Sequence, residues 1–206
     1  MNRNAAYTET VDGFTINIIH DDSGDTESPI ENDLGDNLKF AALHRRYVNP
    51  SKELDSVEAI AEFMQANSAD DSEWACFPLF MYDHSGTIYH ASEGGNPFAC
   101  QWDSGRLGMI ALKRSEYTNA TLETANLICD EYTAWANGEC YGFEIEDGDG
   151  EHVDSCWGFI GDPEGHVLEE AREKVKWFAA DKRKREQADS DAIGIAQTTF
   201  PLHVAL

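Results

Sequence analysis

Charge is distributed along this chain in blocks. Between Arg114 and Arg172 there is no lysine or arginine, while fifteen acids fall within the same span. Seven of the fifteen bases then lie between Arg172 and Arg185. A protein that needs its charge only for solubility is expected to intersperse the two signs. The arrangement therefore favours a surface that is directed at a partner.

The overall balance is strongly acidic. The 206 residues include 39 acids and 15 bases, which gives a formal net charge of −24. Nucleic acid and anionic membranes carry charge of the same sign, so this balance opposes direct binding to either of them. It suits a basic partner, a cation or a very salty cytoplasm.

The apolar content is sufficient for one core. Hydrophobic residues make up 41% of the chain, and its length predicts a single domain over residues 1–206, with residues 1–12 expected to be flexible. No apolar run approaches the roughly 20 residues that span a bilayer, and the first residues are polar. We therefore expect a cytoplasmic protein, located in the host cell if the chain comes from a phage.

The cysteines are expected to be buried free thiols. Their number is odd, they are widely spaced, and none forms the close pair that is typical of a zinc site. They are Cys76, Cys100, Cys129, Cys140 and Cys156. We expect no metal and no cofactor.

Hydrophobic periodicity predicts an α+β fold, with a mixed or antiparallel sheet and about three helices, including a long C-terminal helix. Strands are expected over residues 13–19, 37–44, 77–82, 87–90, 106–113, 140–146 and 152–159, with an edge strand in 198–206. Helices are expected over 55–67, 121–135 and from 163 onward. Asp55 and Asp162 are the predicted caps of the first and third helices.

Each helix has a predicted apolar face. The face of the first helix comprises Val57, Ile60, Ala61 and Met64. The face of the second comprises Leu122, Ala125, Ile128, Cys129, Tyr132 and Trp135. The face of the third comprises Val167, Leu168, Ala171, Val175, Phe178 and Ala179, and its polar face carries the basic cluster.

The turn Asp147-Gly148-Asp149-Gly150 resembles the start of a calcium-binding loop. The calcium pattern requires glycine at its sixth position and glutamate at its twelfth, where this chain has His152 and Gly158. A β-hairpin turn is therefore favoured. His20, Asp21, Asp22 and Asp25 could hold a divalent ion, but a solvated loop is favoured there too.

Two short phrases combine tryptophan, aspartate, serine and glycine. They are Trp102-Asp103-Ser104-Gly105 and Asp154-Ser155-Cys156-Trp157-Gly158. Aromatic anchors at chain corners are the favoured interpretation. The functional alternative is a ligand pocket formed by Asp83, His84, Trp102, Asp103, Asp154 and Trp157.

Nothing in the sequence identifies a reaction. No GxSxG motif is present, and serine, histidine and aspartate that are adjacent in sequence do not by themselves form a nucleophilic triad. A non-enzymatic role is therefore favoured, without assigned catalytic residues. The basic group His44-Arg45-Arg46 could bind phosphate, but ion pairs with the surrounding acids are favoured.

Three stretches, residues 38–47, 77–105 and 141–161, carry a family resemblance. With the two tryptophan phrases as its most specific parts, the chain resembles a family of small acidic proteins of unassigned function from phages and mobile elements. The insert Glu93-Gly94-Gly95-Asn96 and the long basic C-terminal helix depart from that pattern. The resemblance implies a phage or mobile-element origin.

Charge distribution and this setting together favour an acidic DNA mimic that blocks a host DNA-binding nuclease of the restriction or CRISPR type. The expected partner is a basic DNA-binding protein, and a homodimer stays open. We name the predicted partner-binding surface the acidic face: Glu144, Glu146, Asp147, Asp149, Glu151 and Asp154. The alternatives are a small ligand-binding protein or enzyme with an Asp/His pocket, and a salt-adapted protein of structural role.

Overall fold

The computed structural model describes residues 5–199, and the side chains of residues 5–193. In chain order the elements are β1 (Ala5–Val11), β2 (Phe14–His20), β3 (Leu38–Ala42), α1 (Val57–Ala66), β4 (Trp74–Asp83), β5 (Thr87–Ala91), β6 (Ser104–Lys113), α2 (Leu122–Ala136), β7 (Cys140–Glu146), β8 (His152–Ile160) and α3 (His166–Thr199). The predicted α+β class, with antiparallel sheets and a long C-terminal helix, is confirmed.

The chain divides into two compact units, each with a four-stranded sheet. Residues 22–140 form the central unit, and the segments before and after them form the terminal unit. Each unit has a buried cluster of its own. The single domain expected from the sequence stays a prediction.

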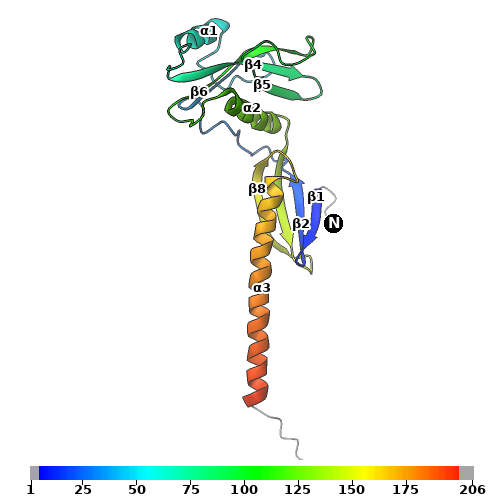
Figure 1. The fold of residues 1–206 in the computed structure, drawn as a ribbon. Coiled ribbons are helices and arrows are strands. Elements are labelled where there is room, and N and C mark those ends of the chain that lie inside the picture. The colour runs from blue at the N-terminus through cyan, green and yellow to red at the C-terminus, as the bar shows by residue number, and fades with distance from the viewer. Residues whose placement is uncertain (1–4, 200–206) are drawn as a thin grey trace, which may run out of the picture. The chain divides into compact units, whose positions relative to one another are not determined.

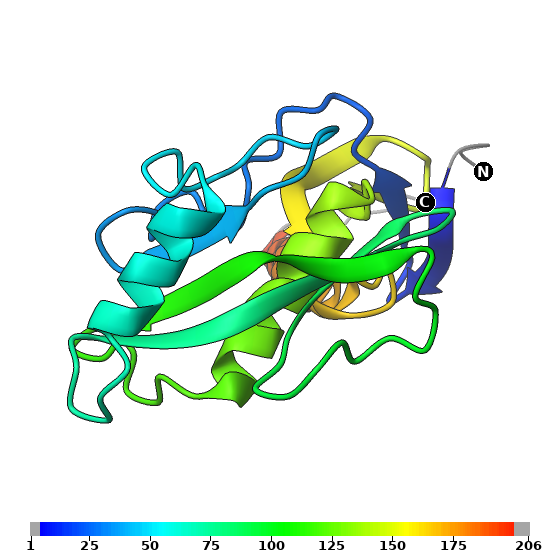
Figure 2. The ribbon, with the colours of Figure 1, turned by 90° about the horizontal axis from the view of Figure 1, so that it is seen from above.

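The central unit is a three-layer structure. Its strands lie in the order β3-β6-β4-β5, and all of its pairings are antiparallel. Helices α1 and α2 lie on opposite sides of this sheet (Figure 1), and Figure 2 shows β4 and β6 side by side. Alternate residues of β6 therefore enter different clusters: Ile110 and Leu112 pack with α2, and Met109 and Ala111 pack with α1.

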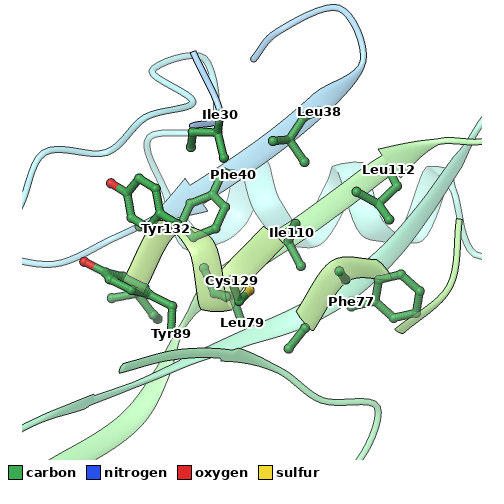
Figure 3. Close-up of a cluster of buried hydrophobic side chains, with 14 of the residues drawn as sticks. Ile30, Leu38, Phe40, Phe77, Leu79, Tyr89, Ile110, Leu112, Cys129 and Tyr132 are labelled. Carbon is green, nitrogen blue, oxygen red and sulfur yellow. The ribbon is translucent and has the colours of Figure 1, made fainter. Parts of the chain in front are cut away.

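The cluster between the sheet and α2 is the larger of the two in this unit (Figure 3). Phe40 lies at its centre, fully buried, with the rings of Tyr89 and Tyr132 at centroid distances of 5.8 and 4.6 Å. Cys129 is buried in the same cluster. Because both faces of the middle strands are covered, these strands read as nearly continuous apolar runs.

Helix α2 also covers the free edge of the sheet. The Asn137 side chain accepts from the Thr87 backbone N–H at 2.9 Å and donates to the Thr87 carbonyl at 2.8 Å. Asn126 binds the Ala91 backbone in the same two-way manner. The backbone groups of Thr87 and Ala91 are thereby satisfied, and the Tyr89 N–H donates to the Thr133 hydroxyl, which protects an edge that would otherwise be open to strand pairing.

The terminal unit has two layers. Its strand order is β1-β2-β7-β8, and α3 packs on one face. The whole predicted apolar stripe of α3 is confirmed: five of its residues are buried, and Phe178 packs against them. In Figure 1 the later part of α3 extends past the strand ends, and the side chains of residues 182–193 are exposed. No helix among the described residues is long and apolar enough to cross a membrane.

Several local predictions are wrong. Ser56, not Asp55, caps α1, and its hydroxyl accepts from the Ala59 N–H at 3.1 Å. The buried side of α1 uses Phe63, whereas Val57 and Ala61 are exposed. Ile60 and Met64 of the predicted apolar face are confirmed, and Ala59 and Phe63 take the places that were expected for Val57 and Ala61.

The start of α3 differs as well. Asp162 accepts from the Glu164 N–H and opens a turn, and the helix begins only at His166, after Gly165. At the N-terminus, residues 5–11 form β1, where a flexible segment was expected. The expected edge strand over 198–206 begins inside α3, and residues 200–206 lie outside the described residues.

Candidate functional site

The acidic face is built on the hairpin of β7 and β8. Phe143 and Ile145 of β7 are buried against α3, so the alternation of the strand turns Glu144 and Glu146 to the opposite side of the sheet. Val153 of β8 also packs toward α3, and its neighbour Asp154 is therefore directed away from the helix. No helix of the terminal unit covers that side among the described residues.

Asp147 holds the hairpin turn. One of its carboxylate oxygens accepts from the backbone N–H groups of Asp149 and Glu151, at 3.0 and 2.9 Å. The left-handed conformation of Gly150, with φ of 82°, completes the turn. The predicted hairpin is confirmed, and Asp149 and Glu151 are exposed at its tip.

None of the six residues of the acidic face forms an ion pair with another residue of the part of the chain that is described. The four strands beneath them contain no lysine or arginine. Among the described residues of this unit, the bases are carried by α3, on the other side of the sheet. The acidic side of the sheet therefore lacks bases, whereas α3 on the other side carries seven bases and seven acids.

Four of the seven bases of α3 have nearby carboxylate partners of their own. Arg172 forms two bonds of 2.7 Å to Glu9 on β1, and this guanidinium lowers the pKa of the Glu9 carboxyl. Arg183 lies 3.8 Å from Asp12, and Arg185 lies 2.7 Å from Asp181. These three arginines are therefore engaged away from the acidic face.

An aromatic ring lies beside the carboxylates. Trp157 packs on Gly142, where a Cβ atom would lie 2.3 Å from the indole ring, and the ring is still 46% exposed. Gly142 faces the same side of β7 as Glu144, so Trp157 lies on the acidic side of the sheet. Regular alternation from Val153 would place Trp157 toward α3, so β8 is irregular between these two residues. Glycine at position 142 is what admits the ring.

The structure brings together four of the six candidate pocket residues. His84 Nδ1 lies 3.3 Å from Asp103 Oδ2, and the Asp83 N–H donates to the Asp103 carbonyl at 2.8 Å. Asp83, Trp102 and Asp103 line a cavity of about 320 Å³. Asp154 and Trp157 instead belong to β8 of the terminal unit.

The same cavity holds residues that were not predicted to belong to it. Arg45, Arg46 and Arg106 line it together with His44. The favoured ion pair for the basic group is confirmed at Arg46, which binds Asp83. The compact His44-Arg45-Arg46 run was the available signal, but only the tertiary fold brings Arg106 beside it.

Cys100 also contacts this group, in an order that does not suit nucleophilic catalysis. Its thiol donates to Asp103 Oδ2 at 3.3 Å, so Asp103 lies between Cys100 and His84. In a triad the histidine contacts the nucleophile and the carboxylate orients the histidine. The arrangement is suited to holding Asp103 in place for binding.

The cysteines differ in environment. Cys129 and Cys140 are buried as expected, Cys76 and Cys100 are partly buried, and Cys156 on β8 is exposed, which corrects the expectation that all five are buried. Burial raises the pKa of Cys76 to about 11 and that of Cys129 to about 12. Within residues 5–193 no three histidine, cysteine or acidic side chains are grouped as metal ligands would be.

Comparison with known proteins gives no relative: no protein-family model, curated protein or solved structure matches the chain. The resemblance to small acidic phage proteins therefore stays a prediction.

Proposed function

We propose that this chain is a counter-defence protein of a phage or mobile element, an acidic DNA mimic that binds the DNA-binding groove of a basic host nuclease of the restriction or CRISPR type. The observation that supports it best is the acidic face itself. Its six carboxylates have no ion-pair partner among the described residues, and the described bases of the same unit lie on α3, on the other side of the sheet.

The spacing of the carboxylates fits a partner that reads a regular row of negative charge. Same-face residues of a strand are about 6.8 Å apart, which applies to Glu144 and Glu146. Each DNA strand carries one charge per about 3.4 Å of axis. The β7 strand thus supplies about half of the charge density of one DNA strand. Asp154 on β8 and the acids of the turn add further charge.

The scaffold under these carboxylates is suited to tight association. The sheet is fixed to α3 by a fully buried set that includes Phe143, Ile145 and Val175, and Asp147 fixes the turn. Groups that are already ordered lose less conformational entropy when a partner binds. A row of fixed carboxylates can therefore compete with DNA without being a substrate for cleavage.

Salt adaptation is the weaker explanation of the charge. It predicts acids spread over the whole surface, with stability that falls at low salt. The concentration of carboxylates without local partners on one side of a base-free sheet favours recognition of a basic surface.

The test is inhibition of DNA cleavage by a panel of restriction and CRISPR nucleases. We expect the intact chain to inhibit at least one nuclease, and the variant E144Q/E146Q/D149S/E151Q/D154N to lose tenfold or more in potency. Asp147 is retained because it holds the turn. The control D22N/D25N/E27Q/E62Q/D70N neutralises five exposed acids of the central unit and should inhibit like the unmodified chain. Equal potency of the two variants would reject the acidic face as the inhibitory surface.

A further inference from the structure

The cavity of the central unit is a built site at one end of its sheet. Strands β3 and β4 end there, and β6 begins there, since both are antiparallel to β6. An irregularity in the β4–β6 register leaves Leu107 as an extra residue at this point, and Leu107 lines the cavity. Such bulges commonly redirect side chains beside functional sites. A volume of about 320 Å³ lies within the range of small-molecule pockets.

Cations are concentrated at this cavity. The central unit contains 21 acids and only seven lysines and arginines, of which Arg45, Arg46 and Arg106 line the cavity. Arg45 and Arg106 form no ion pair with the described residues, and the Arg106 guanidinium donates instead to the Met64 sulfur, a weak acceptor. Two arginines without carboxylate partners, in so acidic a unit, indicate an anion supplied from outside. Arginine is the side chain best suited to bind phosphate through two parallel bonds.

A planar surface borders the same cavity. Trp102 lines it and is 88% exposed, an unusual position for the largest aromatic side chain. Tyr47 stacks on His44 with a centroid distance of 4.9 Å, which fixes a second aromatic group on the rim. An exposed indole beside arginines is the combination that binds nucleobases by stacking.

Asp103 supplies an oriented acceptor. The contacts of Cys100 and His84 both use its Oδ2 atom, so Oδ1 is the oxygen that can accept from a ligand. Sugar hydroxyls and exocyclic amines of nucleobases are donors of that kind.

We propose that this cavity binds a mononucleotide. Arg45 and Arg106 hold the phosphate, Trp102 stacks on the base, and Asp103 accepts from a sugar hydroxyl or a base amine. A mononucleotide fits better than a nucleic-acid strand, because the acids of the unit repel a long polyanion. This inference is independent of the DNA-mimic function, which uses the terminal unit.

The experiment titrates the intact chain with AMP, adenosine, inorganic phosphate and a short oligonucleotide by calorimetry. We expect AMP to bind at least tenfold more tightly than adenosine or phosphate alone. Replacing both arginines, R45Q/R106Q, should weaken AMP binding tenfold or more while leaving adenosine binding nearly unchanged. The control R114Q/K52Q removes two other exposed cations of the same unit and should bind AMP normally.

Trp102→Ala separates the role of the ring from that of the charges. It should weaken the binding of AMP and adenosine by about the same factor and leave phosphate binding unchanged, whereas Trp177→Ala, at an exposed tryptophan of α3, should change none of them. Absence of AMP binding at millimolar concentration, equal affinity for AMP and adenosine, or tighter binding of the oligonucleotide would each overturn the proposal.

Discussion

Arg172 on α3 and Glu9 on β1 form a two-bonded ion pair in which both nitrogen–oxygen distances are 2.7 Å. Arg172 is the first base after the long base-free span, and its charge is used on the helix-covered side of the terminal sheet. Tyr7 donates to the same carboxylate at 3.2 Å. The pair ties the edge strand to the helix and leaves the acids of β7 and β8 without this cation.

The ion pair predicts how stability depends on pH. The Arg172 bonds lower the pKa of Glu9 in the folded chain below that in the unfolded chain. The stabilisation that the ionised Glu9 carboxyl gives to the folded chain is therefore complete above the usual glutamate pKa of about 4.3. It is lost as the pH falls through the lower pKa that Glu9 has in the folded chain. Glu9→Gln should lower the Tm at pH 7, and the difference from the unmodified chain should shrink in acid. Glu173→Gln, at an exposed pair with Lys176, is the control and should change the Tm little.

The hydrogen bonds that cover the β5 edge predict a large loss of stability when one asparagine, Asn137, is replaced. Asn137→Ala removes both bonds to the Thr87 backbone and leaves that donor and acceptor unpaired, so we expect a loss of about 2–4 kcal/mol in the free energy of unfolding. Chemical denaturation measures it. Asn119→Ala, at an exposed position just before α2, should stay within about 0.5 kcal/mol of the unmodified chain. Similar losses in both variants would contradict the capping role.

Two glycines of β6 form a matched pair. A Cβ atom at Gly108 would lie 2.0 Å from the Ala41 carbonyl oxygen, whereas a Cβ atom at Gly105 meets nothing within 4 Å. Gly108→Ala must move a backbone, so it should cost about 2 kcal/mol or more, and Gly105→Ala should be nearly neutral. Urea unfolding of the two variants compares them directly. A neutral Gly108→Ala would mean that β3 and β6 are not packed as described.

Thiol labelling tests the burial of the central cluster. Because burial raises the pKa of Cys129 to about 12 and of Cys76 to about 11, few thiolates exist at these sites at neutral pH. Exposed Cys156 should react fastest with a thiol reagent, and Cys156→Ser should remove that fast phase. Cys129 should react only after denaturation, and partly buried Cys76 should react more slowly than Cys156. Rapid native labelling of Cys129 would contradict its place between the sheet and α2.

Hydrophobic periodicity and turn residues predicted most helices and strands, because interactions between residues close in sequence determine these elements. The apolar face of α2 and the turn between β7 and β8 follow from periodicity and turn chemistry, and the structure confirms them. The error at Ser56 arose because Asp55 and Ser56 are adjacent and each could cap the helix. The error at Asp162 arose because this residue opens a turn of its own, which closes at Gly165 before the helix begins. β1 was missed because its polar alternation gains stability only from pairing with β2 and from the Arg172 bond.

The pairing of strands that are distant in the chain could not be predicted from the sequence. Thr15 pairs with Glu146 across more than a hundred residues, and this pairing joins the two ends of the chain in one unit. No local signal specifies it, because any two amphipathic strands can pair. The place of Arg106 in the cavity could not be predicted for the same reason. Asp154 and Trp157 were assigned to the pocket but lie in a different unit from the other candidate pocket residues.

The central claim is that the acidic face binds in the DNA-binding groove of a host nuclease. Competition between the intact chain and labelled duplex DNA for an inhibited nuclease, at about 50 and 200 mM salt, tests it most directly. We predict displacement of DNA at low salt that weakens steeply at high salt, and that is lost in E144Q/E146Q/D149S/E151Q/D154N but retained in the central-unit control. Inhibition without displacement of DNA, or displacement that is insensitive to salt, would contradict the account.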